Sequence, residues 1–389
     1  MLAIRAGRVF DGERVWPDGA LVFTNGGRIT GIEPAGTFPP DGWPSVEMPH
    51  GTLLPGLIDT HVHLCGDGRT GALDRLPDYS EDRVTAVIAE SLRVQLAAGV
   101  TTVRDLGDRA WAVLGWRAQA GGGPYPQIVA AGPPITSPAG HCWSMGGEVQ
   151  GEQQLRQAVR ERAERGADVV KIMASGGAMT AGTDVLACQF RAEELGTAVD
   201  EAHAAGLPIT AHAHGLPAIE QALAAGVDGI EHCTGLTRNG IELPDRLLAA
   251  LAAAGIAVCP TLGRVEVAGE ESTVLERAGA TYEARLEAVA RMHRAGVRLV
   301  SGADAGITAV KPHGLLPEAV IDLVAAGIPA AEALASATSV AAGVCGLGDR
   351  KGRVRVGFDA DLVLVDGDPI ADPAALRRIA HVIVRGEPR

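Results

Sequence analysis

The middle of the chain repeats one pattern of apolar and polar positions. An alanine-rich amphipathic stretch ends at Ala-Gly, and a short apolar run, often β-branched, follows it. Glycine directly after a helix takes the left-handed conformation that ends the helix, and a continuous apolar run is typical of a buried strand. The repeat therefore predicts helices alternating with parallel strands. It occurs at Ala98-Gly99-Val100, Ala205-Gly206-Leu207, Ala225-Gly226-Val227, Ala254-Gly255-Ile256, Ala295-Gly296-Val297 and Ala326-Gly327-Ile328.

Eight segments have the character of such strands, and eight βα units close most simply into a barrel. An open, doubly wound sheet is the alternative, but no G-x-G-x-x-G follows the first strand, so a nucleotide-binding fold lacks support. We therefore predict an α/β fold, a (β/α)8 TIM barrel. Its strands are expected at residues 53–63, 100–105, 127–132, 168–173, 207–212, 227–232, 256–261 and 297–303.

The two ends of the chain follow a different pattern, in which apolar and polar residues alternate over short runs. Residues 1–50 contain three such runs, and Asn25-Gly26-Gly27 between the second and third indicates a hairpin turn. Residues 351–386 show the same alternation of apolar and polar residues over short runs. Because neither end has enough strands to be stable alone, we expect one small β-sandwich built from both. The predicted segments are 1–52 and 349–389 for the sandwich and 53–348 for the barrel.

Charge and composition narrow the class of protein. The net charge is -13 and no basic run is present, which argues against nucleic acid because phosphates require a basic patch. The longest apolar run, residues 247–259, is too short to span a bilayer, and the N-terminus lacks the apolar stretch of a signal peptide. The six cysteines include no C-x-x-C pair. We expect a cytoplasmic protein with free thiols and no nucleic-acid or membrane partner.

Polar side chains suited to metal binding lie where the predicted strands end. His61 and His63 end the first strand, and side chains two residues apart in a strand point to the same face. Active sites of such barrels lie at the C-terminal ends of the strands. We therefore expect six residues to converge at one mouth. The other four are Lys171 in strand four, His212 and His232 at the ends of strands five and six, and Asp304 after strand eight.

This set of residues resembles that of the amidohydrolase superfamily. Its members combine an H-x-H on strand one, a lysine on strand four, single histidines on strands five and six, and an aspartate on strand eight. Three phrases are also similar to those of the prolidase-like branch of metal-dependent dipeptidases and carboxypeptidases. They are Lys171 with Ser175-Gly176-Gly177, Ala211-His212-Ala213-His214-Gly215, and Ser301-Gly302-Ala303-Asp304-Ala305-Gly306. The resemblance covers nearly the whole chain, including the split β-sandwich.

The resemblance implies two divalent metal ions, usually Zn²⁺. His61 and His63 would hold the more buried ion with Asp304. His212 and His232 would hold the other ion. Lys171 would become N6-carboxylysine and bridge both. A lysine in a largely apolar strand has a lowered pKa, so its free amine can react with carbon dioxide. The alternative for Lys171 is an anchor for a phosphate or carboxylate.

The implied reaction is hydrolysis of an amide or peptide bond in a small molecule such as a dipeptide or an N-acyl amino acid. Two metal ions about 3.5–4 Å apart would share a hydroxide and lower its pKa. Asp304 would accept the proton and pass it to the leaving amine. The alternative substrates are a cyclic amide, an imidazolone-like ring, or a xenobiotic amide or carbamate. A metal-dependent deaminase and a non-catalytic scaffold are more remote, because deaminases usually lack the lysine and a scaffold would have lost several ligands.

Two further histidines are candidates for substrate contacts. His141 follows Ala139-Gly140, where resembling proteins carry a glycine-glycine-histidine that faces the substrate. His214 points the same way as His212 if the strand continues, so either could be the ligand, and the resemblance selects His212. Tyrosine is common at the position of His214 in resembling proteins. We also expect residues 179–190 to line the pocket. Barrels of this type often associate, so a homo-oligomer is an open expectation.

Overall fold

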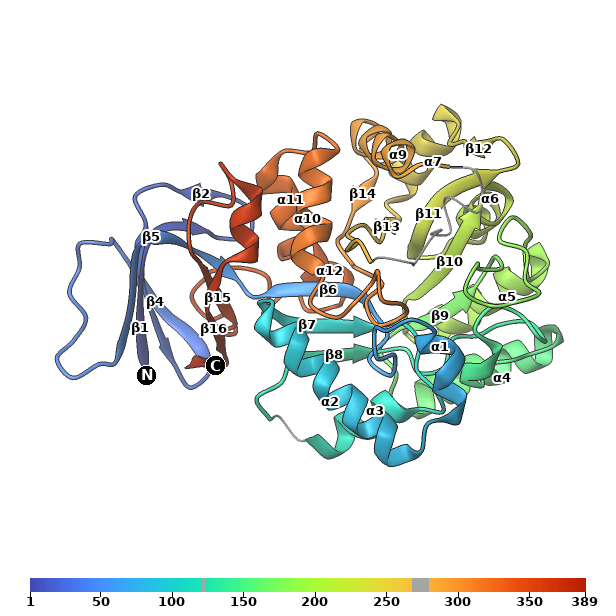
Figure 1. Ribbon diagram of the computed structural model, residues 1–389, viewed down its shortest axis with the longest axis horizontal. Coiled ribbons are helices and arrows are strands. Elements are labelled where there is room, and N and C mark those ends of the chain that lie inside the picture. The colour runs from blue at the N-terminus through green and yellow to red at the C-terminus, as the bar shows by residue number, and fades with distance from the viewer. Residues whose placement is uncertain (121–122, 268–279) are drawn as a thin grey trace.

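The computed structural model describes residues 1–120, 123–267 and 280–389, and these form a mixed α/β fold (Figure 1). One sheet draws its strands from both ends of the chain, in the order β17-β16-β15-β5-β1-β3-β4 with β2 beside β1. These strands are β1 (Leu2–Phe10), β2 (Val15–Trp16), β3 (Ala20–Asn25), β4 (Arg28–Glu33), β5 (Ser45–Pro55), β15 (Leu362–Val365), β16 (Ile379–Val384) and β17 (Glu387–Pro388). We call this the terminal sheet.

The terminal sheet depends on both ends of the chain. Strand β5 pairs in parallel with β1 and antiparallel with β15. The predicted hairpin at Asn25-Gly26-Gly27 is confirmed, because β3 and β4 pair antiparallel across it with Asn25 opposite Arg28. A small hydrophobic core joins residues such as Ile4 and Val22 to Leu362 and Ile383. A two-layer sandwich within this sheet stays a prediction.

Parallel strands occupy the middle of the chain, as the sequence predicts. Two sheets have the orders β6-β7-β8 and β14-β13-β11-β10-β9, and every neighbouring pair in them is parallel. A short strand β12 (Gly240–Ile241) pairs antiparallel with β11. The parallel strands are β6 (Leu57–Val62), β7 (Val100–Asp105), β8 (Gln127–Ala130), β9 (Val170–Met173), β10 (Ile209–Gly215), β11 (Gly229–Thr237), β13 (Ala257–Cys259) and β14 (Arg298–Leu299).

Helices separate these strands along the chain. The glycines of all six Ala-Gly steps have positive φ, which confirms that they end helices. The helices are α1 (Ala72–Arg75), α2 (Glu81–Ala97), α3 (Ala112–Ala120), α4 (Gly151–Glu164), α5 (Ala192–Ala204), α6 (Leu216–Ala225), α7 (Asp245–Ala254), α9 (Tyr282–Arg294), α10 (Leu316–Ala325), α11 (Ala330–Ser336) and α12 (Ser339–Val344). Three 3-10 turns are η1 (Leu76–Asp78), η2 (Trp143–Met145) and η3 (Pro373–Arg377).

The strand expected at residues 53–63 is divided at Gly56. Residues before it belong to β5 in the terminal sheet, and residues after it begin β6. A Cβ at Gly56 would lie 2.1 Å from Oγ1 of Thr101, so only glycine allows the chain to pass so close to β7 at this step. The predicted boundary between residues 52 and 53 falls inside β5. The division of the chain into three segments stays a prediction.

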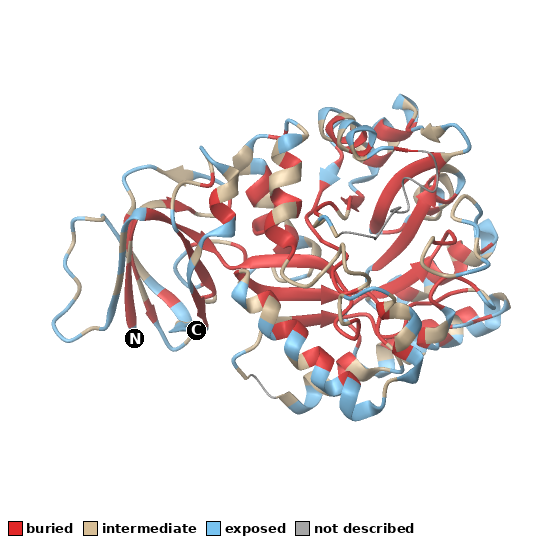
Figure 2. Cartoon of the chain, viewed as in Figure 1, coloured by how far each residue is buried: buried red, intermediate tan, exposed pale blue. Residues whose placement is uncertain are grey.

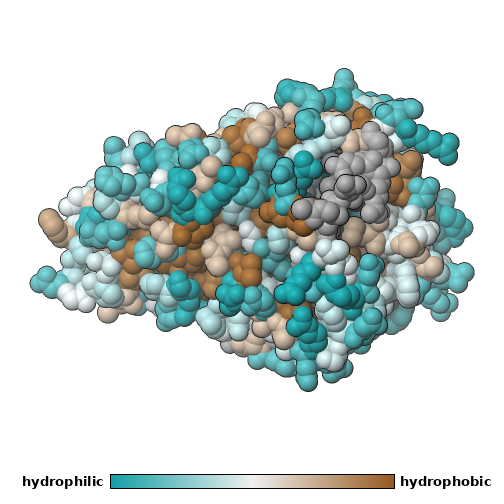
Figure 3. Space-filling model, viewed as in Figure 1, coloured by the Kyte–Doolittle hydropathy of each residue, from teal (hydrophilic) through white to brown (hydrophobic). Residues whose placement is uncertain are grey.

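The parallel strands form the buried centre of the molecule. Figure 2 shows most of them red along nearly their whole length, whereas helices such as α2 are buried on one side and exposed on the other. Backbone hydrogen bonds also join the two parallel sheets, from Asp168 N to Ala130 O at 2.9 Å and from Thr60 N to Ser301 O at 3.1 Å. The face in Figure 3 is mostly hydrophilic, with small scattered apolar groups. No described helix is long and apolar enough to cross a membrane.

Candidate active site

Three candidate side chains meet where β6 ends. The Nε2 atoms of His61 and His63 lie 3.3 and 3.2 Å from the same oxygen, Oδ1 of Asp304. Nδ1 of His61 lies 2.8 Å from the Glu231 carboxylate. Nδ1 of His63 lies 2.9 Å from the carbonyl oxygen of Gly107. A hydrogen bond donated by Nδ1 leaves Nε2 as the ligating nitrogen, which is typical of histidines that bind metals.

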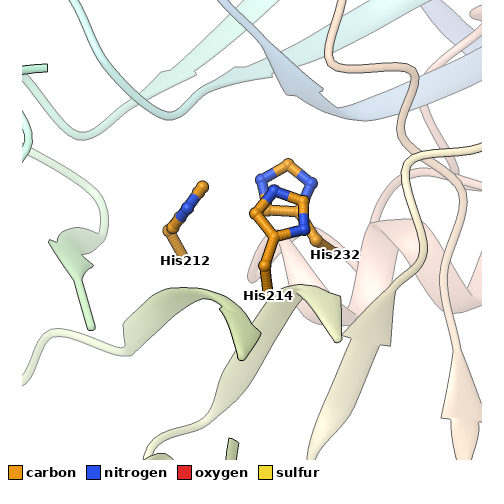
Figure 4. Close-up of side chains that lie close together, drawn as sticks. All are labelled: His212, His214 and His232. Carbon is orange, nitrogen blue, oxygen red and sulfur yellow. The ribbon is translucent and has the colours of Figure 1, made fainter. Parts of the chain in front are cut away.

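Three more imidazoles lie beside this group (Figure 4). His212 and His214 come from β10 and His232 from β11. Their ring centroids are 4.3–4.8 Å apart, and the rings of His214 and His232 are stacked. One possible ligand atom from each of the three lies within 4.8 Å of the others, and the same holds for His61, His232 and Asp304. Imidazole nitrogen and carboxylate oxygen are donors that suit zinc, so these two groups could hold metal ions.

His232 enters the cavity because its backbone departs from a regular strand. In the pairing of β10 with β11, His212 lies opposite Glu231, so regular alternation would turn the next side chain, His232, away. The φ of His232 is 67° and that of Asp304 is 57°, values that non-glycine residues rarely adopt. The Arg285 guanidinium, itself buried, donates to the carbonyl oxygen of His232. Arg285 thus holds the turn that directs His232 inward.

Lys171 projects from β9 into the same cavity. Only 1% of its surface is exposed. Among the described residues, its Nζ has no hydrogen-bond partner and no ion-pair partner. Burial lowers the pKa of the Lys171 amine, and the Glu231 and Asp304 carboxylates only partly oppose this. A buried amine without a partner favours its neutral form, which is the form that reacts with carbon dioxide.

Burial and one carboxylate set the charges in the cavity. Burial lowers the pKa of His61 to about 4 and those of His141 and His214 to about 3, so these rings are neutral at pH 7. Burial also acts to lower the pKa of His63, but Asp304 outweighs it and that pKa is raised. Burial acts to raise the pKa of Asp304, but His61 and His63 hold it well below its usual range. Asp304 is therefore ionised and can accept a proton.

His141 lies at the same cavity, in the loop between β8 and α4. Its Nδ1 is 2.8 Å from Oγ1 of Thr180, and its ring centroid is 4.6 Å from that of His212. A Cβ at Gly177 would lie 2.4 Å from Nε2 of His141. Gly177 is thus required where it is, because any larger residue would displace the histidine. Within the expected pocket segment 179–190, Met179 is the residue that lines the cavity.

The cavity has a volume of about 430 Å³. Its wall also carries apolar side chains, including those of Leu73 and Ile307, and three basic ones besides Lys171. Two of the basic groups are engaged with the backbone, since Arg285 donates to Pro260 O at 2.9 Å and Lys311 to Thr261 O at 2.7 Å. The third, Arg264, stacks its guanidinium 4.2 Å from the ring centroid of Tyr282. The eight candidate residues in the lining are His61, His63, His141, Lys171, His212, His214, His232 and Asp304.

Sequence reasoning overlooked Glu231. Its carboxylate, 1% exposed, contacts Nδ1 of His61, accepts from Arg104 at 2.9 Å and accepts from Thr210 at 2.7 Å. Burial acts to raise the pKa of Glu231, but Arg104 and His61 hold it well below its usual range. It therefore orients His61 as a charged acceptor. The available signal was an acidic residue directly before His232 in an otherwise apolar strand.

A second overlooked signal is the scarcity of lysine. Of the 34 Lys and Arg residues, three are lysines, namely Lys171, Lys311 and Lys351. Lys171 and Lys351 are buried, and Lys311 lines the cavity. A chain that uses arginine for nearly all of its cations retains lysine in its interior and at its cavity. That bias marks Lys171 even without the rest of the motif.

Comparisons with known proteins identify the family. Residues 52–389 match the amidohydrolase family, and the chain belongs to it. An uncharacterized protein of Mycobacterium tuberculosis is 31% identical over 346 residues, which cover 86% of this chain and 85% of that protein. The ochratoxinase of Aspergillus niger is 28% identical over 360 residues, which cover 82% of this chain and 71% of that protein.

Solved structures agree with this assignment. A Xaa-Pro dipeptidase with methionine bound in its active site has a TM-score of 0.88 and 26% identity, with coverage of 100% of this chain and 99% of that chain. A prolidase complexed with N-methylphosphonate-L-proline has a TM-score of 0.86 and 25% identity, with the same coverage. The resemblance to prolidase-like amidohydrolases is confirmed. The protein is an amidohydrolase, an enzyme that hydrolyses carbon–nitrogen bonds.

Proposed function

We propose that this enzyme hydrolyses an amide or peptide bond of a dipeptide or an N-acyl amino acid at a centre of two divalent metal ions. One observation carries the proposal. A buried lysine without a partner among the described residues, a carboxylate and six histidines line one cavity. Imidazole nitrogens, a carboxylate and an amine that can be carboxylated are groups suited to bind divalent metal ions when they face one cavity.

The scaffold we propose is a closed (β/α)8 barrel. The support is that the parallel sheets β6-β7-β8 and β14-β13-β11-β10-β9 are linked at both edges. Asp168 N donates to Ala130 O between β8 and β9, and Thr60 N donates to Ser301 O between β6 and the segment after β14. A closed barrel explains why candidate residues from five strands or the segments directly after them meet at one mouth.

The donors fall into two groups. His61, His63 and Asp304 would hold one ion, most simply Zn²⁺. His212 and His232 would hold the second. Lys171, as N6-carboxylysine, would supply an anionic oxygen to each. When bound, such ions supply Lewis acidity to the scissile carbonyl and to the attacking water.

The proton is handled by Asp304. Its carboxylate is ionised, lines the cavity and lies 3.2 Å from Nε2 of His63. It can accept a proton from the attacking water and return it to the leaving nitrogen, and such general acid–base steps contribute about 10²- to 10⁴-fold. His141, neutral and oriented by Thr180, would contact the substrate carbonyl.

One basic side chain in the cavity wall favours a substrate that carries a carboxylate. Among the described residues, the guanidinium of Arg264 has no ion pair or hydrogen bond, and it lines the cavity above Tyr282. Guanidinium groups bind carboxylates with two parallel hydrogen bonds. Dipeptides and N-acyl amino acids both present a carboxylate next to the scissile amide.

A second candidate is hydrolysis of an apolar or aromatic amide or carbamate. The support is the set of apolar side chains in the cavity wall, including Leu73, Leu262, Ile307 and Val310, together with the similarity to ochratoxinase. Such a substrate would use the same metal centre but would not require Arg264.

The proposal is tested by metal analysis, isotope labelling and a substrate screen. Active protein should contain close to two divalent ions per chain. With ¹³C-bicarbonate, the NMR spectrum should show a carbamate resonance that disappears in Lys171→Met and persists in Lys351→Met. Zinc-loaded protein should then be screened with dipeptides, N-acyl amino acids and aryl amides. Active protein with metal near zero, or without the carbamate resonance, would contradict the centre.

A further inference from the structure

His214 lies among the candidate ligands of the second ion, although the resemblance to the family selects only His212 and His232. It follows His212 by two residues on β10, so both side chains face the cavity. Figure 4 shows its ring directly beside that of His232, and the two centroids are 4.3 Å apart with an interplanar angle of 18°. Ligand atoms of all three histidines lie within 4.8 Å of one another.

The hydrogen bonds behind His214 repeat those behind His232. Nδ1 of His214 lies 2.8 Å from Oγ1 of Thr234, and Nδ1 of His232 lies 2.9 Å from Oγ1 of Thr261. In both cases the hydroxyl can accept from Nδ1, which leaves Nε2 with its lone pair toward the cavity. An outer hydrogen bond of this kind fixes the orientation of a metal-binding imidazole.

The backbone of His214 is held in place as well as its ring. Its backbone N–H donates to Oγ of Ser175 at 3.1 Å, and the side chain is 7% exposed. Within the described part of the chain, Nε2 of His214 has no hydrogen-bond partner. A buried nitrogen with an unused lone pair beside two other imidazoles is suited to a cation.

We propose that His214 is a third imidazole ligand of the second metal ion, beside His212 and His232. The inference rests on the proposed metal centre. Zinc–nitrogen bonds of about 2.0–2.1 Å place two donors at most about 4 Å apart, so small rotations of the rings complete a shared coordination sphere. Three imidazoles make this site richer in nitrogen than one built from two, and imidazole favours zinc, copper and nickel over manganese and magnesium.

The test measures metal binding by the full-length protein rather than turnover. Metal-free wild type, His214→Gln and the control His141→Gln are titrated with Co²⁺, and the visible spectrum and a competing chelator report two affinities. We expect His214→Gln to weaken the second equivalent about 100-fold and to leave the first within about threefold. His141→Gln removes a cavity histidine outside the three-imidazole group and should change neither affinity by more than about threefold.

Two threonine variants test the orientation without removing the ligand. Thr234→Val deletes the hydroxyl behind His214 at nearly constant volume, and it should weaken the second equivalent about 10-fold. Thr234→Ser should restore it. X-ray absorption of the zinc-loaded protein should show about one imidazole fewer per two ions in His214→Gln. Circular dichroism of the metal-free variants checks that each has folded.

Three results decide the matter. Loss of the second equivalent in His214→Gln alone supports the proposal. Two unchanged affinities in His214→Gln overturn it, and if KM rises in that variant at the same time, His214 is a substrate contact. Wild-type protein that binds no divalent ion overturns the proposed function as well, so the two failures are distinguishable.

Discussion

Lys351 and Lys171 are both buried, but the surrounding residues differ. Lys351, in the loop before β15, is 5% exposed, and its Nζ contacts the carboxylates of Asp361 and, at 3.3 Å, Asp359. Lys171 is 1% exposed and has no such partner among the described residues. The first arrangement is complete within the protein. The Lys171 amine instead faces the cavity without an ion-pair partner among the described residues.

Both lysines are buried, so burial alone does not distinguish a structural lysine from a functional one, whereas their partners do. Around the terminal sheet, opposite charges cancel locally, and Arg28 and Arg350 complete the network at Asp359. In the cavity, imidazoles are packed together and the amine is left alone. An amine without a hydrogen-bond partner, which faces a cavity beside clustered imidazoles at the ends of parallel strands, indicates a binding site.

The largest expected effect is on catalysis by Lys171→Ala. Hydrolysis should fall by about 10⁴-fold or more, because the two ligand oxygens and the negative charge of the proposed carbamate would be lost together. Turnover and metal content are measured on purified protein. Short carboxylates such as acetate or propionate should restore part of the activity by occupying the vacated space. Near-normal turnover without added carboxylate would contradict the assigned role.

Asp304→Asn should reduce turnover by about 10²- to 10⁴-fold while most of the metal remains bound. An amide oxygen can still act as a weak ligand but cannot accept the proton. Turnover and metal content are compared in the same preparation. An unchanged kcat would remove Asp304 as the proton carrier, whereas complete loss of metal would show that its main role is as a ligand.

The two regions should also differ in their response to acid. His61, His141 and His214 have folded-state pKa values of about 3–4, because they are buried, against about 6.5 when unfolded. Between these values the unfolded chain binds protons that the folded chain does not, so stability falls as pH falls from about 6.5 to about 4. The loss is about 1 kcal/mol per pH unit for each histidine.

Denaturant unfolding of the metal-free protein at pH 7, 6 and 5 measures this loss. His63 opposes this loss of stability, since its pKa is raised. More histidines have a lowered pKa, however, because His212 and His232 belong to that set as well. Bound zinc should reduce the loss over this range, because it binds only the folded site. A metal-free protein equally stable at pH 7 and pH 5 would show that these rings are not buried as neutral groups.

Lys351→Met should destabilise the fold by about 3–5 kcal/mol, because it leaves buried carboxylates without their cation. Lys171→Met should leave the metal-free protein at least as stable as wild type, because it removes an uncompensated amine. Urea unfolding of both metal-free variants makes the comparison, and activity of folded Lys351→Met should be normal. Equal destabilisation by both changes would mean that Lys171 has a structural partner after all.

Much of the architecture could be predicted, because periodicity reports burial. Continuous apolar runs after Ala-Gly steps located five of the parallel strands, β7, β10, β11, β13 and β14, whereas the step at Ala326-Gly327-Ile328 is followed by helix α11. Alternation at residues 61 and 63 placed two imidazoles on one face. The division of one long strand at Gly56 was not predicted, because it depends on a close contact with Thr101 on another strand. Local sequence carries no information about such a contact.

The candidate site shows the same limit. His232 was expected at the end of a strand, but β11 continues to Thr237. Strict alternation would have turned its side chain away, and its positive φ directs it inward. By the same rule Glu231 lies inside, where it contacts His61. Arg264 could not be placed at all, because it lies after β13 in a segment without regular structure. The positions of side chains that come together from distant loops depend on tertiary packing, which the local sequence pattern does not report.

The smallest effect we expect separates substrate binding from the metal centre. Arg264→Gln should raise KM about 10- to 100-fold for a substrate with a free carboxylate, which corresponds to a lost charged hydrogen bond of about 1.5–3 kcal/mol. The kcat value should change little, because Arg264 is not among the residues that we propose hold the metal ions or carry the proton. The matched control is the same substrate with its carboxylate converted to an amide, for which wild type and variant should have similar KM. If KM rises equally for both substrates, Arg264 supports the cavity through Tyr282 and does not bind the carboxylate. If an aryl amide is the better substrate and its KM does not change in the variant, the second candidate function is favoured.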